Sequence, residues 1–99
     1  MTRQVEFETF EWDFEKERQN IAKHGLGFEE ASLIFRDPQK IVLADHEHSR
    51  SEERWLCFGK VGSHVATVRF VFRGARTRIL GAGFWRKGRK VYEKENPQK

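Results

Sequence analysis

Residues 54–81 read RWLCFGKVGSHVATVRFVFRGARTRILG. Within them, apolar and polar side chains alternate in three runs that are separated by short connections containing glycine. Such alternation predicts strands, and connections this short join antiparallel neighbours. The predicted strands of this meander are Arg54–Lys60, His64–Phe72 and Arg76–Gly81.

The central run divides its side chains between the two faces of the predicted sheet, because successive residues of a strand point in opposite directions. One face carries Val68, Phe70 and Phe72, and we expect that set to be purely core. The other face carries Thr67, Arg69 and Val71. We therefore expect this second face to mix apolar and charged residues.

The first predicted helix lies upstream of the meander, where the apolar spacing changes. Asp13 is its predicted N-cap, and Gly25 ends it directly after Lys23 and His24. Four residues spaced at i, i+4, i+7 and i+8 lie on one side of this helix: Phe14, Arg18, Ile21 and Ala22. The apolar residues at the two ends of this set indicate the side that we expect to be buried.

A second, shorter helix is predicted to begin at Gly27 and to end at Asp37-Pro38, because a residue before proline avoids the helical conformation. Glu29 and Glu30 fall in its first turn, where acidic side chains are favourable. We expect its buried stripe to be Phe28, Ala31, Ile34 and Phe35.

The remaining segments complete an α+β fold. We expect strands at Gln4–Trp12 and Ile41–Ala44, a mobile polar loop at Asp45–Glu53, a basic helix over about Arg86–Glu95 and a disordered tail at Asn96–Lys99. Two N-terminal helices and the C-terminal helix should then pack on a mostly antiparallel sheet of four to five strands. We expect the helices to cover one face and to leave the other partly open.

Length and composition predict a single domain over residues 1–99, because a chain of this size supports one core. Cys57 is the sole cysteine, so no internal disulfide forms, and its apolar strand indicates a core residue and not a nucleophile. Neither a leader peptide nor an apolar run of about 18 residues is present. We therefore expect a cytoplasmic protein without a membrane span.

Charge is divided sharply along the chain. Residues 1–59 carry a net charge of −5 and residues 60–99 a net charge of +9, which together give +4. The cations of the second half are mostly arginines among aromatic residues, as in Phe84-Trp85-Arg86, and this pattern favours contact with RNA. A solvated basic surface is the alternative. If the open sheet face is edged by Arg69, Arg76 and Arg78 and by the basic helix, it forms a cationic shelf for a nucleic-acid strand.

Several segments, in order, resemble the BrnT toxins of bacterial type II toxin–antitoxin pairs, from about Phe10 to Glu93. They are Phe10-Glu11-Trp12-Asp13, Asn20 with Lys23-His24-Gly25, Phe28-Glu29-Glu30-Ala31 with Phe35 and Asp37-Pro38, His48-Ser49 with Glu52-Glu53-Arg54, Arg73-Gly74, Arg76–Leu80, and Arg89-Lys90-Val91-Tyr92-Glu93.

The resemblance implies a RelE-like fold and a ribonuclease that cleaves RNA and arrests translation. It also implies a cognate DNA-binding antitoxin that covers the basic face, with the complex built as paired heterodimers. The chain departs from the family pattern at Gly81-Ala82-Gly83, where Ser-Ala-Arg is usual. Arg86 is a candidate to supply that missing cation. A non-catalytic RNA- or protein-binding module with the toxin fold remains the alternative.

Cleavage of RNA without a metal needs a base, an acid and cations that stabilise the phosphorane. His24, Lys23 and Tyr92 are the candidates for moving protons, although the first two also suit a helix C-terminus and Tyr92 also suits packing. The expected catalytic set is completed by Arg54, Arg78 and Arg89. The expected RNA-binding set is Arg69, Arg76, Trp85, Arg86 and Lys90.

Two of these assignments compete with simpler interpretations. Arg54 follows Glu52 and Glu53, so an ion pair with either acid is the slightly favoured interpretation. The run Asp45–His48 contains potential metal ligands, but in an extended chain its histidines and its acids would point to opposite sides. A third ligand from elsewhere would then be needed, so we expect neither a metal site nor a cofactor.

Overall fold

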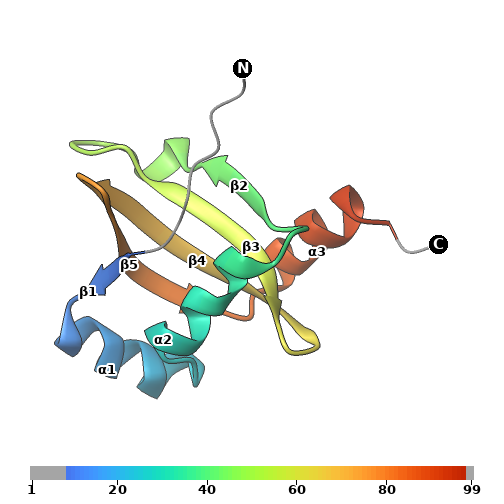
Figure 1. Cartoon of the computed structure of the whole chain (residues 1–99), viewed down its shortest axis with the longest axis horizontal. Helices are drawn as coiled ribbons and strands as arrows, with labels where there is room; N and C mark the ends of the chain where they lie inside the picture. The colour runs from blue at the N-terminus through green and yellow to red at the C-terminus, as the bar shows by residue number, and fades with distance from the viewer. Residues whose placement is uncertain (1–8, 98–99) are drawn as a thin grey trace.

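The computed structural model describes residues 9–97, and Figure 1 shows its single five-stranded sheet with the order β1-β5-β4-β3-β2. β1 runs parallel to β5, and the other neighbours are antiparallel. This arrangement confirms the α+β prediction. The elements in chain order are β1 (Phe10–Trp12), α1 (Phe14–His24), α2 (Phe28–Ala31), the 3-10 helix η1 (Ser32–Arg36), β2 (Ile41–Ala44), the 3-10 helix η2 (His46–His48), β3 (Trp55–Val61), β4 (His64–Arg73), β5 (Arg76–Gly83) and α3 (Arg86–Glu95).

One face of the sheet, the α1/α2 face, carries the larger core. The second helical stripe is buried as predicted, although its last turn is the 3-10 helix η1. Phe35 packs against Phe70 with ring centroids 5.2 Å apart, and Trp12 meets the edge of Phe28 at 6.1 Å. The sheet contributes Cys57, whose pKa is raised to about 12 by burial, so it carries no reactive thiolate, in agreement with the core interpretation.

A buried polar side chain, and not the predicted apolar stripe, docks α1 on this core. Asn20 donates to the carbonyl oxygens of Leu26 and Ala82, each at 2.9 Å, and accepts from the Ala82 N–H at 3.1 Å. Phe14 and Ile21 point away and are 72% and 48% exposed, so their expected burial is wrong. The helix ends were predicted correctly, because Asp13 accepts from the Lys16 N–H at 2.9 Å and Gly25 is left-handed, with φ 67°.

α3 lies on the opposite face, which we call the α3 face. The expectation that helices cover one face therefore holds for α1 and α2, and the basic helix lies on the other face, which it was expected to edge. It packs there through Gly88, at which a Cβ would overlap Thr67 Oγ1 and would lie 2.9 Å from a ring carbon of Phe58. A second, smaller core forms beneath it around Phe58, Val65 and Tyr92. Glycine is required at residue 88 because nothing larger lets the helix backbone approach the sheet this closely.

An irregularity in β5 changes which side chains of β4 are buried. Arg69 pairs with Gly81 but the next residue, Phe70, pairs with Ile79, so Leu80 has no partner on β4. The expectation that only Val68, Phe70 and Phe72 form a purely core set on this strand is wrong. Val71 is fully buried although it points to the α3 face, while Phe72 is 39% exposed at the end of the strand. The bulge brings Gly81 onto the same face as Arg78, since cross-strand partners share a face.

Other boundaries differ from the predictions in small ways. Of the strand expected at Gln4–Trp12, residues 4–8 lie outside the described part of the chain, as do residues 98–99 of the expected tail. Asn96 is ordered, because its side chain donates to the carbonyl oxygens of Gln39 at 3.1 Å and Tyr92 at 3.0 Å. No helix within residues 9–97 is both long and apolar enough to cross a membrane.

Asp37 joins three segments of the chain at the C-terminal end of α3. One carboxylate oxygen accepts from the Gln39 N–H at 2.8 Å, and the other accepts from the Lys60 N–H at 2.9 Å and the Tyr92 hydroxyl at 2.7 Å. Burial alone raises the pKa of Asp37, but these hydrogen bonds outweigh it and hold the pKa below the ordinary 3.8. The ionised carboxylate therefore helps to fasten α3 to β3.

We predict that Gly88→Ala destabilises the protein by about 1 to 3 kcal/mol, because the added methyl group is overpacked against Thr67. Helix propensity alone predicts the opposite sign, a gain of about 1 kcal/mol. The free energy of unfolding from urea titration distinguishes the two. Thr67→Ala should restore much of the loss in the double variant, since the removed hydroxyl has no hydrogen-bond partner among the described residues. A stabilising Gly88→Ala would contradict this packing.

We predict that Asp37→Asn lowers the free energy of unfolding at pH 7 by about 1 to 3 kcal/mol. A carboxyl whose pKa is lowered by folding stabilises the folded state fully at pH values above the pKa of the unfolded chain. This contribution is lost as the pH falls through the pKa of the folded state. The difference between wild type and variant should thus shrink below about pH 4. Glu11 and Asp13 also have lowered pKa values, so only this difference reports on Asp37. The exposed Glu30→Gln is the control, and a gap that persists at pH 2 would refute the assignment.

Candidate active site

α3 divides the open part of its face into two hollows. The first, which we call the groove, has a volume of about 520 Å³, within the range of ordinary ligand sites. Its floor is the sheet at Leu56 and Thr67, and one wall is the first turn of α3 with Lys87. The opposite wall is η2 with His48. Arg69 and Trp85 complete its lining.

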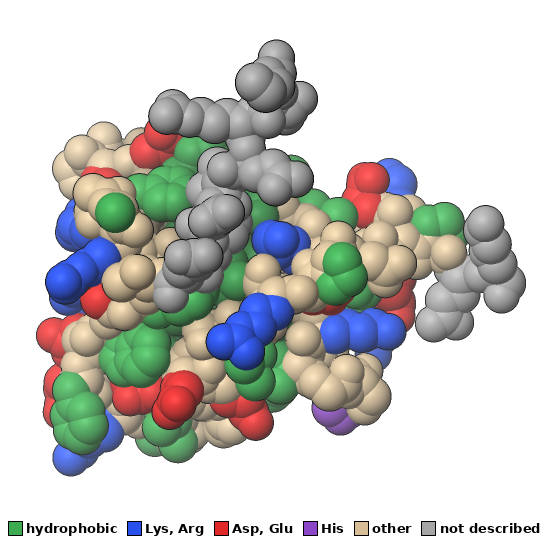
Figure 2. Space-filling view, in the orientation of Figure 1, with side chains coloured by type: hydrophobic (Ala, Val, Ile, Leu, Met, Phe, Trp, Pro, Cys, Tyr) green, Lys and Arg blue, Asp and Glu red, His purple; other side chains and the backbone are tan. Residues whose placement is uncertain are grey.

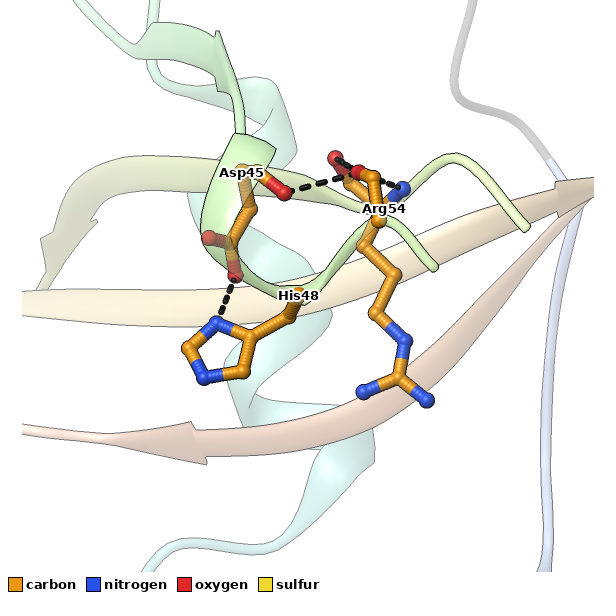
Figure 3. Close-up of polar contacts among 4 residues, drawn as sticks. Asp45, His48 and Arg54 are labelled. Atoms are coloured by element: carbon orange, nitrogen blue, oxygen red, sulfur yellow. Dashed lines mark hydrogen bonds and ion pairs between the residues drawn. The ribbon is translucent and has the colours of Figure 1, made fainter. Parts of the chain in front are cut away.

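The η2 wall holds a histidine in a fixed orientation (Figure 3). His48 Nδ1 lies 2.8 Å from Asp45 Oδ2, and the Asp45 side chain is 9% exposed whereas that of His48 is 50% exposed. An ionised carboxylate only accepts, so Nδ1 carries the proton and Nε2 is the free acceptor of the neutral ring. With a neutral ring, the pair therefore presents Nε2 as a hydrogen-bond acceptor at the wall of the groove.

The turn that carries this pair is tied at its base. Ser49 Oγ donates to the Asp45 carbonyl oxygen at 2.7 Å and accepts from the Arg54 N–H at 2.8 Å. The Asp45 N–H in turn donates to the Arg54 carbonyl oxygen at 2.8 Å. The segment expected to be a mobile loop is therefore anchored on β3.

Arg54 leaves this base with its side chain extending to the same side as the His48 ring (Figure 3). The alternative of an ion pair with Glu52 is wrong, because Glu52 pairs with Arg73 instead. Within residues 9–97, Arg54 forms no salt bridge. This guanidinium extends from the residue that closes the η2 turn, and it lines neither hollow.

Arg69 and Trp85 form a second fixed unit in the groove. The Arg69 guanidinium carbon lies 5.4 Å from the Trp85 ring centroid, in cation–π geometry. Gly83 makes room for the indole, because a Cβ there would lie 2.7 Å from a ring carbon of Trp85. A Cβ at Gly81 would meet Arg69 at 3.6 Å, which is an ordinary van der Waals contact. The cation beside Gly81 and Trp85 is therefore Arg69 of β4.

His24 approaches the same indole from α1. Its ring meets the edge of Trp85, with centroids 5.1 Å apart, and it lines neither hollow. Lys23 and Lys90 are likewise exposed and line neither hollow. The described structure therefore does not bring the predicted proton-transfer residues Lys23 and His24 into the groove.

Arg76 and Arg78 share a carboxylate on the edge strand β1. Arg78 Nη1 lies 2.7 Å from Glu11 Oε2, and Arg76 Nη1 lies 3.5 Å from Glu11 Oε1. The hydrogen bond from Arg78 is the main reason that the pKa of Glu11 is lowered. Two cations against one anion leave a net positive charge on the α3 face, as the sequence predicted for this strand.

The remaining predicted residues lie on the other side of α3. Arg86, Arg89 and Tyr92 line the second hollow, which we call the α3 cavity. The Tyr92 phenol donates to Asp37, and burial together with this carboxylate raises its pKa to about 12. The hydroxyl proton of the predicted catalytic Tyr92 is therefore used in a hydrogen bond that stabilises the fold.

The α1/α2 face differs from the α3 face in its charge pattern. Figure 2 shows basic side chains scattered among acidic ones on the α1/α2 face.

Sequence reasoning missed His48 and Lys87 as site residues. The signal for His48 was present in the segment His48-Ser49 with Glu52-Glu53-Arg54. The extended geometry expected for residues 45–48 is also wrong, because η2 is a 3-10 turn. It brings atoms that could bind a metal, from Asp45, Glu47 and His48, within 4.8 Å of one another. Asp45 already bonds His48 within that cluster, so the geometry matches an oriented histidine.

The groove therefore joins an oriented histidine, the two cations Arg69 and Lys87 and an aromatic ring on one surface, a combination suited to binding and cleaving a phosphodiester. Comparison with curated proteins found no match. Among protein families, residues 12–88 match the one described as the ribonuclease toxin, BrnT, of type II toxin–antitoxin systems. This match spans most of the chain, including α1, η2, the meander and the first three residues of α3. The chain belongs to the BrnT family of ribonuclease toxins, whose members function with an antitoxin partner.

Proposed function

We propose that the protein is a metal-independent endoribonuclease that cuts RNA in the groove. The observation that carries this proposal is the Asp45–His48 pair at a wall that also presents Lys87, Arg69 and Trp85. Family membership supplies the reaction class, and the side chains of the groove supply each chemical role.

The reaction is an attack of the ribose 2′-oxygen on the adjacent phosphorus. His48 Nε2 takes the 2′-OH proton as the 2′-O–P bond forms, and Asp45 stabilises the resulting imidazolium. The P–O5′ bond then breaks, and the leaving oxygen takes a proton from Lys87. The products are a 2′,3′-cyclic phosphate and a 5′-hydroxyl, with every bond and proton accounted for by side chains of this chain.

The cations have separate tasks. Two guanidinium groups stabilise the charge that builds on the phosphorane. One is that of Arg69, which is held against Trp85, and the other is that of Arg54, which extends to the same side as the His48 ring (Figure 3). Arg76 and Arg78 extend the positive surface along β5, and Trp85 offers an edge or face for a base. A preorganised guanidinium is effective here because it does not have to reorient as charge develops.

Cleavage of cellular RNA by this groove inhibits translation in the cytoplasm. A DNA-binding antitoxin neutralises the protein by covering the same cationic surface, since an acidic or amphipathic segment both blocks RNA and relieves repulsion among the arginines. A complex of paired heterodimers with the antitoxin at its centre completes the proposal.

We predict that the purified protein cleaves single-stranded RNA in the presence of EDTA. Fragments should end in 2′,3′-cyclic phosphate, identified by mass spectrometry, because the attacking group is the 2′-oxygen. His48→Ala protein purified in parallel controls for contaminating nucleases. Intact RNA with a salt-sensitive mobility shift would favour the non-catalytic binding module. Activity lost in EDTA and restored by zinc would instead assign a metal to Asp45, Glu47 and His48.

We predict that His48→Ala lowers kcat by about 10²- to 10⁴-fold with little change in KM, the usual effect of removing a general base. Added imidazole should restore part of the rate, which a purely structural defect would not allow. His46→Ala is the matched control, because this exposed histidine of the same turn does not line the groove. Equal rates for wild type and His48→Ala would eliminate this residue as the base.

A further inference from the structure

The α3 cavity lies on the other side of α3 from the groove and has a volume of about 860 Å³. Lys60 and His64 line it from the β3–β4 hairpin, and Arg86 and Arg89 line it from α3. Phe84 and Trp85 contribute aromatic rings to the same wall. Nothing in the proposed cleavage reaction uses this cavity.

The charges of the cavity are unbalanced. Lys60, Arg86 and Arg89 face a single lining carboxylate, that of Glu93. None of these three cations forms a salt bridge with another residue in the range 9–97. Asp37, the nearby acid, is already occupied by three hydrogen bonds. Clustered cations of this kind are stabilised when a polyanion neutralises them.

The cavity and the groove meet at Trp85, which lines both. The next two residues continue the division, because Arg86 faces the cavity and Lys87 faces the groove. A polyanionic strand that crosses the first turn of α3 can therefore contact cations on both sides of the helix without a break.

Exposed rings favour a nucleic acid over an acidic peptide as the occupant. Phe84 is 46% exposed at the cavity, and its ring lies 5.9 Å from that of His64 in an edge-on arrangement. Single-stranded nucleic acids are bound by such a combination of cations along the backbone and rings against the bases. The carboxylate groups of an acidic peptide would pair with the cations but would not stack on the aromatic rings.

We propose that the α3 cavity binds the nucleotides that flank the cleaved bond, so that one single-stranded RNA passes from the groove over Trp85 into the cavity. This inference rests on the proposed ribonuclease function. It assigns Arg86 and Arg89 to the grip on flanking phosphates and Phe84 to stacking on a flanking base. Substrates too short to reach the cavity then lose that grip.

The test measures binding separately from cleavage. Fluorescence anisotropy with non-cleavable 2′-O-methyl RNA compares a trinucleotide with a strand of about 10 nucleotides, a typical single-strand site size. Wild type should bind the longer strand much more tightly. Arg86→Ala/Arg89→Ala should lose this advantage, and the slope of log affinity against log salt should fall by about 1.4, since each phosphate contact contributes about 0.7. Phe84→Ala should weaken the longer strand by about 5- to 150-fold while keeping the slope.

Lys16→Ala/Arg18→Ala provides the matched control, because it removes equal charge from exposed positions of α1 that line neither hollow. Unfolding curves confirm that each variant is folded. Unchanged length dependence and slope in Arg86→Ala/Arg89→Ala would overturn the inference. So would loss of polyglutamate binding with full RNA affinity, which would assign the cavity to an acidic protein. Length-dependent binding without cleavage by any preparation would uphold the path of RNA from the groove into the cavity and refute the nuclease.

Discussion

Close contact between Gly88 of α3 and Thr67 of β4 governs the functional surface of this protein. The helix backbone rests directly on the sheet at this point, because a side chain at residue 88 would overlap the threonine hydroxyl. α3 consequently lies across the middle of an open face, and the groove and the α3 cavity are the spaces left on its two sides. Asp37 fastens the far end of the helix by accepting from the Tyr92 hydroxyl at 2.7 Å.

The fold gathers the basic residues of the second half of the chain on the α3 face. The basic second half forms β4, β5 and α3, which together build the α3 face, while the acidic first half supplies selected partners to it. Glu11 neutralises part of the Arg76 and Arg78 pair, and Glu52 pairs with Arg73. Arg54, Arg69 and Lys87 form no salt bridge among the described residues, and the latter two line the groove together with His48, so both are available to an incoming phosphate.

Conformational freedom is restricted where the proposed chemistry needs fixed positions. Asp45 orients His48, Trp85 holds Arg69, and the Ser49 hydroxyl ties the base of the η2 turn to β3. On the opposite face, the Asn20 amide bonds both backbone groups of Ala82, next to Gly83, which accommodates the Trp85 ring. A buried polar anchor under the site keeps β5 in register, since an unpaired amide there would cost about 1 to 3 kcal/mol.

The order of residues was sufficient for features that depend on near neighbours: the Asp13 and Gly25 caps, the Phe28–Phe35 stripe and the meander, because caps, periodicity and turns are local. Family resemblance carried the reaction class. The burial of Val71, the exposure of Phe14 and the side of the sheet that α3 occupies depended on packing between segments distant in the chain. The site followed the same division: arginine-rich strands were visible in the sequence, but the Asp45–His48 pair and the separation of Arg69 from Arg86 required the folded chain, since both arise where η2 and α3 are set against the sheet.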